Sequence, residues 1–287
     1  MEQRNRIMNK NKFAGILLVS DMDGTLLNTH DVISTQNHTA LTHFVAHGGA
    51  FTIATGRIET SIEHYLPQLP MTVPAILYNG AMIYDFQSNK SLWTATLPPT
   101  IAEIIQSLTG NLPELGIEIY ANSQVYLWAE NAWTTEHLNR ENLPIQYSST
   151  LKGIPEPWQK ILLAWAPAKI EALESHLIEL NLPLSFVRSE PYFLEILPQN
   201  INKGSALTRL VYASGFDLAN VVAMGDNPND LEMLQTAGFG IAVENAHPSL
   251  KRVGVFSTCC NDDHAIAAVV DWIESGLPLF GSSREKG

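Results

Sequence analysis

The sequence predicts an α/β protein in which a parallel sheet with crossover helices is interrupted by an inserted α+β segment. Short apolar runs alternate with amphipathic patterns before residue 84, and the same alternation returns near residue 198. Alternation of strands and helices is typical of parallel sheets. We therefore expect a core domain over residues 13–84 and 198–280, an inserted domain over 85–197, and flexible tails at 1–12 and 281–287.

The first part of the core contains three apolar runs with the length of buried strands. They cover residues 16–19, 51–54 and 75–78. Ser34 is a suitable N-cap for the helix between the first two runs, and Gly48-Gly49 is a suitable end. A shorter helix through Ile62 and Tyr65 precedes the third run. The three runs are predicted to be strands of one parallel sheet.

The insert has a different pattern, with paired β-rich runs and separate amphipathic helices. The runs on either side of residues 121–123 predict a hairpin. Helices are predicted over 101–108 and 170–180, and further strands over 161–165, 184–187 and 192–197. The insert is therefore predicted to be an α+β domain of its own.

The last part of the chain returns to the pattern of the core. A helix is predicted over 205–211 and a strand over 221–224. Asn227 is predicted to cap the next helix, with Pro228 at its first position, where proline fits. Closing strands are predicted over 239–243 and 253–256, and a last helix is predicted to begin at Asp262.

Polar side chains stand at the ends of the predicted core strands or at the starts of the helices beside them. The carboxyl ends of parallel strands lie at one edge of a sheet, which is where ligands bind in open α/β sheets. We therefore expect these side chains to converge. The set comprises Asp21, Asp23, Thr55, Gly56, Lys203, Asp226, Asn229 and Asp230.

The residue types in this set predict chemistry on a phosphate group. Crowded carboxylates repel one another and a phosphate, and Mg²⁺ removes that conflict because it binds carboxylates and substrate phosphate together. Lys203 supplies a second positive charge, while the Thr55 hydroxyl and the backbone N–H groups after it can hold phosphate oxygens. Asp21 can then attack phosphorus as a nucleophile. Asp23 can protonate the leaving oxygen and later activate water.

Composition limits the partners and the compartment. The chain has 287 residues, with 17 Lys and Arg against 29 Asp and Glu, so its formal charge is −12. This charge argues against nucleic acid or an anionic membrane as the main partner. The two cysteines, Cys259 and Cys260, are adjacent and do not form a disulfide framework. With no apolar run long enough to span a membrane, a cytoplasmic location is predicted; the oligomeric state stays open.

Four motifs in order resemble those of the haloacid dehalogenase superfamily of phosphohydrolases. They are Asp21-Met22-Asp23-Gly24-Thr25, then residues 54–57 (ATGR), Asn202-Lys203-Gly204, and residues 225–230 (GDNPND). Residues 78–81 before the insert and 194–198 after it are similar to the Cof-type subfamily. The resemblance covers about residues 14–275, with the insert similar only in size and layout.

The resemblance implies a Rossmann-like core with a mobile α/β cap, and a Mg²⁺-dependent phosphatase acting on small phosphorylated metabolites such as sugar phosphates or phosphorylated vitamin precursors. Asp21 matches the family's nucleophile and metal ligand, and Asp23 its acid/base, which also offers the metal a backbone carbonyl. The remaining matches are Asp226 to a metal ligand and Thr55, Gly56, Lys203 and Asn229 to phosphate contacts.

Several alternatives stay open at this point. A phosphomutase would use the same core, and a non-catalytic binding module of this fold is a third possibility. Asp230 belongs either to the metal shell or only to the start of its helix, where an acidic residue is favoured. Arg57 is either a structural ion pair, which we favour, or a substrate contact. The residues of the cap that set specificity are not identified by sequence.

Overall fold

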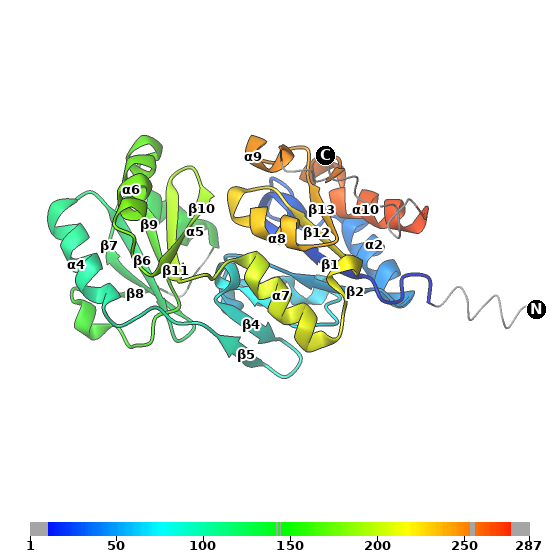
Figure 1. The fold of residues 1–287 in the computed structure, drawn as a ribbon, viewed down its shortest axis with the longest axis horizontal. Helices are drawn as coiled ribbons and strands as arrows, with labels where there is room; N and C mark the ends of the chain where they lie inside the picture. The colour runs from blue at the N-terminus through cyan, green and yellow to red at the C-terminus, as the bar shows by residue number, and fades with distance from the viewer. Residues whose placement is uncertain (1–10, 142, 144, 253–255, 277–287) are drawn as a thin grey trace, which may run out of the picture. The chain divides into compact units, whose positions relative to one another are not determined.

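The computed structural model describes residues 11–141, 143, 145–252 and 256–276. The chain forms two compact units, drawn in Figure 1. The first unit comprises Met1–Thr55, Tyr65–Ala75 and Leu207–Gly287, and the second comprises Gly56–His64 and Ile76–Ala206. The predicted tails fall almost entirely outside the described residues. The predicted limits of core and insert stay a prediction.

The first unit is built on a five-stranded parallel sheet in the order β14-β13-β12-β1-β2. Its strand β1, which lies between β12 and β2, is buried along its whole length, as the apolar run there predicts. Five of the six predicted core strands form this sheet, although residues 253–255 of the last one lie outside the described part of the chain. The bounds are β1 Leu17–Ser20, β2 Ala50–Ile53, β12 Val221–Gly225, β13 Phe239–Ala242 and β14 Phe256–Ser257.

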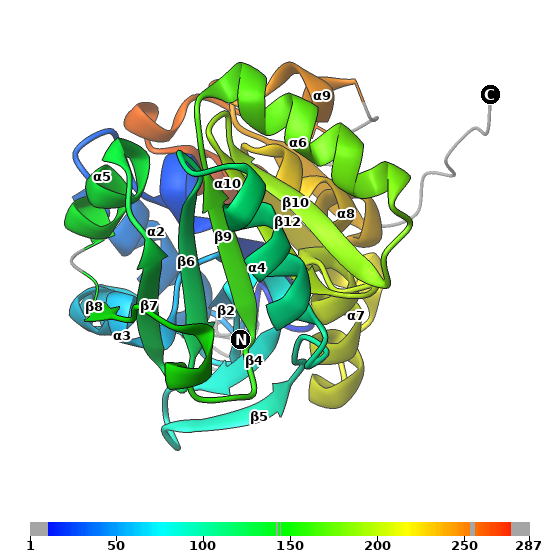
Figure 2. The ribbon, with the colours of Figure 1, turned by 90° about the vertical axis from the view of Figure 1, so that its left-hand side faces the viewer.

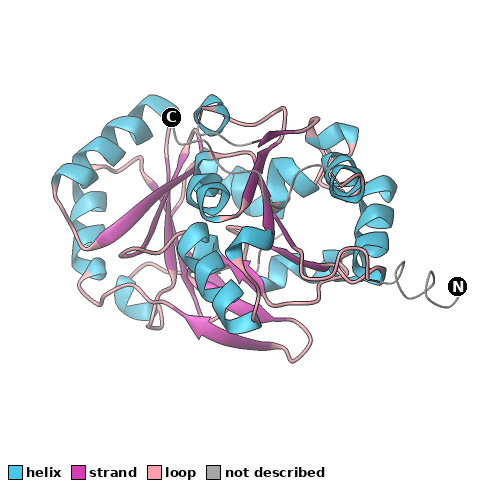
Figure 3. Ribbon diagram, turned by 45° about the vertical axis from the view of Figure 1, so that its right-hand side comes forward, coloured by secondary structure: helices cyan, strands magenta, loops and turns pink. Residues whose placement is uncertain are grey.

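Helices accompany the strands in both units (Figure 3). In the first unit α2 (Thr35–Ala46) packs against α10 (Ala265–Glu274). The predicted cap is confirmed, because the Ser34 hydroxyl accepts a hydrogen bond from the Asn37 N–H at 3.2 Å. Two shorter helices of this unit are α8 (Leu231–Thr236) and α9 (Pro248–Lys251). Helix α7 (Lys203–Ser214) begins in the second unit and continues in the first. No helix in the described part of the chain combines the length and hydrophobicity needed to cross a bilayer.

The predicted start of the last helix at Asp262 is wrong. Asp262 lies in the short 3₁₀ turn η7 (Asn261–Asp263), and His264 follows with a left-handed φ of 64° before α10 begins. The Asp262 carboxylate instead accepts hydrogen bonds from the N–H and the hydroxyl of Thr29, at 2.9 and 3.1 Å. A carboxylate engaged with another loop does not cap its own helix.

The second unit contains a six-stranded sheet in the order β10-β11-β9-β6-β7-β8, with β8 parallel to β7 and the other pairs antiparallel. The predicted hairpin is confirmed: β6 and β7 are joined by Asn122 and Ser123, whose φ values of 51° and 61° are those of a tight hairpin turn. The bounds are β6 Gly116–Ala121, β7 Gln124–Ala129, β8 Ile145–Tyr147, β9 Lys160–Ala164, β10 Leu184–Glu190 and β11 Phe193–Pro198.

Helices α4 (Ile101–Asn111) and α6 (Pro167–Glu179) cross the same face of this sheet, as Figure 2 shows. Their apolar residues form one buried cluster with Ile117, Ile161 and Ile196 of the strands. Both helices were predicted, whereas α5 (Ala132–Glu141) was not. Glu118 and Lys160, which are next to Ile117 and Ile161 in the sequence, point to the opposite face of the sheet.

The third predicted core strand forms but belongs to a different sheet. β3 (Ala75–Leu77) lies with β4 (Met82–Asp85) and β5 (Lys90–Thr94) in a separate three-stranded sheet, whereas β2 pairs with β1. The segment before β3 takes the place beside β2: the Thr72 N–H donates to the Phe51 carbonyl at 3.0 Å, and the Thr52 hydroxyl donates to the Pro74 carbonyl at 2.9 Å. Backbone pairing of this kind carries no sequence signature, so the strand was assigned to the wrong sheet.

Candidate active site

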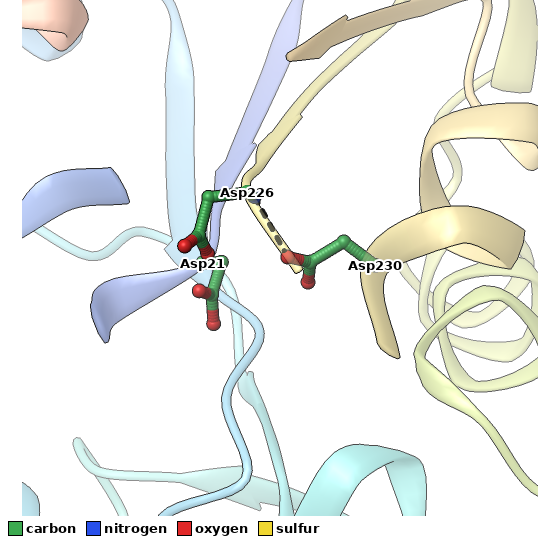
Figure 4. Close-up of side chains that lie close together, drawn as sticks. All are labelled: Asp21, Asp226 and Asp230. Carbon is green, nitrogen blue, oxygen red and sulfur yellow. Dashed lines mark hydrogen bonds between the residues drawn. The ribbon is translucent and has the colours of Figure 1, made fainter. Parts of the chain in front are cut away.

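Three buried aspartates meet at the carboxyl edge of the five-stranded sheet. Asp21, Asp226 and Asp230 each offer a carboxylate oxygen, and these oxygens all lie within 4.8 Å of one another. Figure 4 shows Asp21 and Asp226 next to each other, with Asp230 reaching toward them from the neighbouring helix. The exposed fractions of the three residues are 5%, 7% and 0%. Carboxylates crowded and buried in this way could hold a metal ion, which would offset their mutual repulsion.

Pairing of β1 with β12 brings the first two aspartates together. The strands are parallel, with Ser20 opposite Met224, so the residues that follow each strand leave the sheet at the same edge. The Asp21 N–H donates to the Met224 carbonyl at 2.9 Å, which continues the ladder by one step. The predicted convergence of these strand ends is therefore correct for Asp21 and Asp226.

Gly24 is required by the approach of Asp226. Its φ is +73°, in the left-handed region, and a Cβ built on it would collide with the carboxylate of Asp226. The Asp226 carboxylate accepts a hydrogen bond from Asn227 Nδ2 at 3.0 Å and lies 3.5 Å from the Thr25 hydroxyl. The opening loop and the Asp226 loop thus fit closely against each other.

Asp230 lies both at the start of its helix and in the acidic cluster. One of its carboxylate oxygens accepts hydrogen bonds from the N–H groups of Asp226 and Asn227, at 2.9 and 3.1 Å, so it caps the turn η6 (Pro228–Asp230). Asn227 and Pro228 occupy the predicted cap and first positions. Asp230 nevertheless also belongs to the acidic cluster. It can therefore hold the Asp226 loop in place and add charge beside a cation.

The other predicted site residues of the first unit lie on these two loops or directly after β2. Asp23 is half-buried in the loop after Asp21, with extended φ and ψ of −71° and 124°. Asn229 is buried in the turn that carries Asp230, and Thr55 is buried after β2. The roles assigned to Asp23, Thr55 and Asn229 stay predictions.

Gly56, Arg57 and Lys203 belong to the second unit. Lys203 is completely buried at the start of α7, and Arg57 is also buried. Gly56 packs so closely on Asn79 that a Cβ built on it would lie 2.9 Å from Asn79 Nδ2. The approach of Gly56 and Lys203 to the aspartates stays a prediction.

A polar network that sequence did not reveal lies on the second unit's six-stranded sheet. His137 of α5 contacts Glu118 through Nδ1 at 3.0 Å and Glu141 through Nε2 at 3.1 Å, and the Tyr120 hydroxyl donates to Glu118 at 2.7 Å. Burial opposes the charged form of His137, but the two carboxylates outweigh it and raise the pKa of His137 to about 10. α5 is thus held to the sheet by charge as well as by apolar contact.

Comparison with known proteins agrees with the motifs. A family model described as haloacid dehalogenase-like hydrolase matches residues 18–270. The 5-amino-6-(5-phospho-D-ribitylamino)uracil phosphatase YwtE of Bacillus subtilis is 29% identical over 281 residues, covering 89% of this chain and 97% of the relative. The pyridoxal phosphate phosphatase YbhA of Escherichia coli is 28% identical over 254 residues, covering 82% and 90%.

A solved structure extends the agreement to the fold. A haloacid dehalogenase-like hydrolase from Bacteroides thetaiotaomicron superposes with a TM-score of 0.80 at 29% identity, covering 90% of this chain and 99% of the other. The predicted combination of a parallel core sheet with an inserted segment is thereby confirmed. Since the family model covers most of the sequence and the acidic cluster joins two of its motifs, the chain belongs to the haloacid dehalogenase-like hydrolases and is a phosphatase.

Proposed function

We propose that the protein is a Mg²⁺-dependent phosphatase that hydrolyses small phosphorylated metabolites through an aspartyl-phosphate on Asp21. The observation that carries this proposal is the meeting of Asp21, Asp226 and Asp230 at the carboxyl edge of the sheet. Three buried carboxylates form a set of hard oxygen donors, which suits Mg²⁺ better than a softer metal.

The residues that would hold the metal are Asp21 and Asp226 through their carboxylates and Asp23 through its backbone carbonyl. Asp230 would contribute charge from beside them. When bound, Mg²⁺ would neutralise the charge that otherwise keeps a phosphate away from these carboxylates. The chemistry of the donor set therefore fits the ion that the motifs predict.

The reaction divides between the two aspartates of the opening motif. A carboxylate oxygen of Asp21 attacks phosphorus, and the bond from phosphorus to the leaving oxygen breaks while Asp23 donates a proton to that oxygen. Asp23 then takes a proton from water, which attacks the aspartyl-phosphate and releases inorganic phosphate. The Thr55 hydroxyl, the Gly56 N–H, the Lys203 ammonium and the Asn229 amide are the proposed contacts to the phosphate oxygens.

The relatives suggest which substrates to try first. YwtE is named for a phosphorylated ribitylaminouracil and YbhA for pyridoxal phosphate. Both compounds are small phosphomonoesters, so we propose that this chain also acts on a small phosphorylated metabolite. A cytoplasmic location, with neither nucleic acid nor membrane as partner, agrees with the composition and is part of the proposal.

Release of inorganic phosphate from a panel of such compounds tests the proposal. We expect turnover with Mg²⁺, none after EDTA treatment, and recovery when Mg²⁺ is restored. Asp21→Asn should abolish turnover and leave no aspartyl-phosphate. Full activity in EDTA after extensive dialysis would contradict the metal assignment. If product formed only with a bisphosphate activator and without free phosphate, the enzyme would be a phosphomutase.

A second experiment separates Asp23 from Asp21. Loss of proton transfer in Asp23→Asn should slow formation of the aspartyl-phosphate by about 10²- to 10⁴-fold on an alkyl phosphate. The loss should be smaller on p-nitrophenyl phosphate, since p-nitrophenolate departs without a proton. Single-turnover measurement isolates this step from hydrolysis of the intermediate. Equal losses on both substrates would show that Asp23 is not the acid.

A further inference from the structure

We infer that Lys160, on the first position of β9, is a positioning residue for the phosphate-contacting loop and acts through the carbonyl of Gly56. This inference rests on the proposed role of Gly56 as a phosphate contact. Sequence gave no reason to single out Lys160, which is one lysine at the start of an apolar strand. All the contacts that support the inference lie within the second unit.

The Lys160 ammonium is buried between three neighbours. Its Nζ donates to the Gly56 carbonyl at 2.9 Å, pairs with Glu195 Oε2 at 2.9 Å, and lies 4.2 Å from the centroid of the Tyr120 ring. Lys160 and Glu195 are only 2% and 3% exposed. The hydrogen bond goes to the Gly56 carbonyl, Glu195 supplies the opposite charge, and the Tyr120 ring supplies a cation–π contact.

Strand register explains how the partners meet. Tyr120 of β6 lies directly opposite Lys160 of β9. Glu195 of β11 lies opposite Leu162, two residues further along β9, so its side chain is on the same face as that of Lys160. The sheet therefore presents a fixed ammonium group, and the Gly56 carbonyl that accepts its hydrogen bond lies 104 residues away in the chain.

A buried ion pair alone would not explain this arrangement. Desolvation of a buried pair offsets much of its attraction, so apolar residues would stabilise the sheet as well or better. The third contact, to a backbone carbonyl outside the sheet, is the feature that a packing role does not require. It points to control of the chain at Gly56.

The contact fixes one rigid peptide group. The Gly56 carbonyl and the Arg57 N–H belong to the same planar unit. This unit is joined through the Gly56 Cα to the peptide that carries the Gly56 N–H, the proposed phosphate contact, so holding the oxygen restrains that N–H as well. The next carbonyl, that of Arg57, accepts a hydrogen bond from the Tyr78 N–H at 3.1 Å. With Asn79 packed against the Gly56 Cα, the loop is held from three directions. Donors fixed before substrate arrives bind a phosphate without reorganisation.

Three variants separate positioning from simple stabilisation. Lys160→Met removes the donor to Gly56 and breaks the ion pair. Glu195→Gln breaks the ion pair but leaves Lys160 able to donate, so it is the matched control. The double variant Lys160→Met/Glu195→Gln leaves no unpaired buried charge and guards against misfolding of the single variant. The measurements are kcat, KM, inhibition by inorganic phosphate, and the midpoint of thermal unfolding.

We expect Lys160→Met and the double variant to lower kcat/KM by about 10- to 100-fold, which is the effect of misplaced binding groups. Inhibition by inorganic phosphate should become about tenfold weaker in both variants. Glu195→Gln should lower the unfolding midpoint but keep phosphate inhibition within about threefold of the wild type, because the Gly56 contact persists. Lys160→Arg, which keeps a charged donor, should recover part of the loss.

Two results would overturn the inference. Phosphate inhibition and kcat/KM in the double variant could match the wild type, or Glu195→Gln could lose as much phosphate affinity as Lys160→Met. Either would show that Lys160 only stabilises the sheet, while the proposed function would stand. A wild-type enzyme with neither Mg²⁺-dependent turnover nor inhibition by inorganic phosphate would instead overturn the proposed function, and this inference with it.

Discussion

Replacement of His137 by glutamine should make the protein less stable and change how its stability depends on pH. His137 bridges the buried carboxylate of Glu118, at 3.0 Å, and the partly buried carboxylate of Glu141, at 3.1 Å. Removing one partner of a buried ion pair leaves uncompensated charge, which costs about 3–5 kcal/mol. We therefore expect His137→Gln to lower the free energy of unfolding by about this amount near neutral pH.

The pH dependence follows from the pKa of His137, which is about 10 in the folded protein against 6.5 for an unperturbed histidine. The folded state binds the proton of His137 more tightly than the unfolded state does. The contribution of protonated His137 to stability is therefore complete below pH 6.5 and is lost as the pH rises through 10. At about 1.4 kcal/mol per pH unit, the whole contribution is roughly 5 kcal/mol. The difference in stability between wild type and His137→Gln should shrink by about 2 kcal/mol from pH 7.5 to 9.

Urea unfolding followed by circular dichroism at several pH values measures this difference. His176→Gln is a matched control, because His176 is an exposed histidine on α6 of the same unit. It should change the free energy of unfolding by less than about 0.5 kcal/mol at every pH. A difference between wild type and His137→Gln that stayed constant from pH 7.5 to 9 would refute the assignment of a charged, buried imidazole.

Three further substitutions test the first unit. Gly24→Ala should lower kcat/KM at least about tenfold, because the new Cβ displaces the Asp226 carboxylate. The control is Gly15→Ala, which should reduce stability alone, because Gly15 has a φ of +82° but nothing lies within 4 Å of its Cβ. Equal activities of the two variants would contradict the steric argument. Asp230→Asn keeps an oxygen that can accept the backbone N–H groups, so we expect a nearly unchanged unfolding midpoint. Activation by Mg²⁺ in a metal titration should be about tenfold weaker. Unchanged activation would show that Asp230 is not part of the metal site. Ser34→Ala should reduce the free energy of unfolding by about 1 kcal/mol in urea, and no change would mean that the cap contributes nothing.

Sequence predicted the parts of the fold that have an apolar signature. β1 and β12 are unbroken buried runs, and the polar residues that follow them could be placed at one sheet edge from parallel topology alone. α5 was missed because its sequence, AWTTEHLNRE, has no apolar stripe, and His137 fixes it to the sheet through charged contacts. The sheet to which β3 belongs was assigned wrongly because strand length and hydrophobicity do not specify a partner.

The candidate site was predictable to the extent that its residues follow strands. Asp21 and Asp226 were expected to meet, and they do. The dual position of Asp230, in a helix cap and in the acidic cluster, could not be resolved by sequence, because both roles select a carboxylate at that place. Lys160 carries no motif at all, since its partners come from distant strands and from a backbone carbonyl.

The position of β1 between β2 and β12 has a consequence for the order in which the chain folds during synthesis. Thr25 and Asp226 are in contact, but 201 positions separate them, so a ribosome must make the whole inserted segment before β12 exists. Until then β1 has an open edge and lacks its later neighbour, a state in which strands associate wrongly. The inserted segment has its own six-stranded sheet and apolar cluster, and these can form from residues already made. In truncated chains that end before residue 221, the six-stranded sheet should therefore resist proteolysis while β1 is still cleaved.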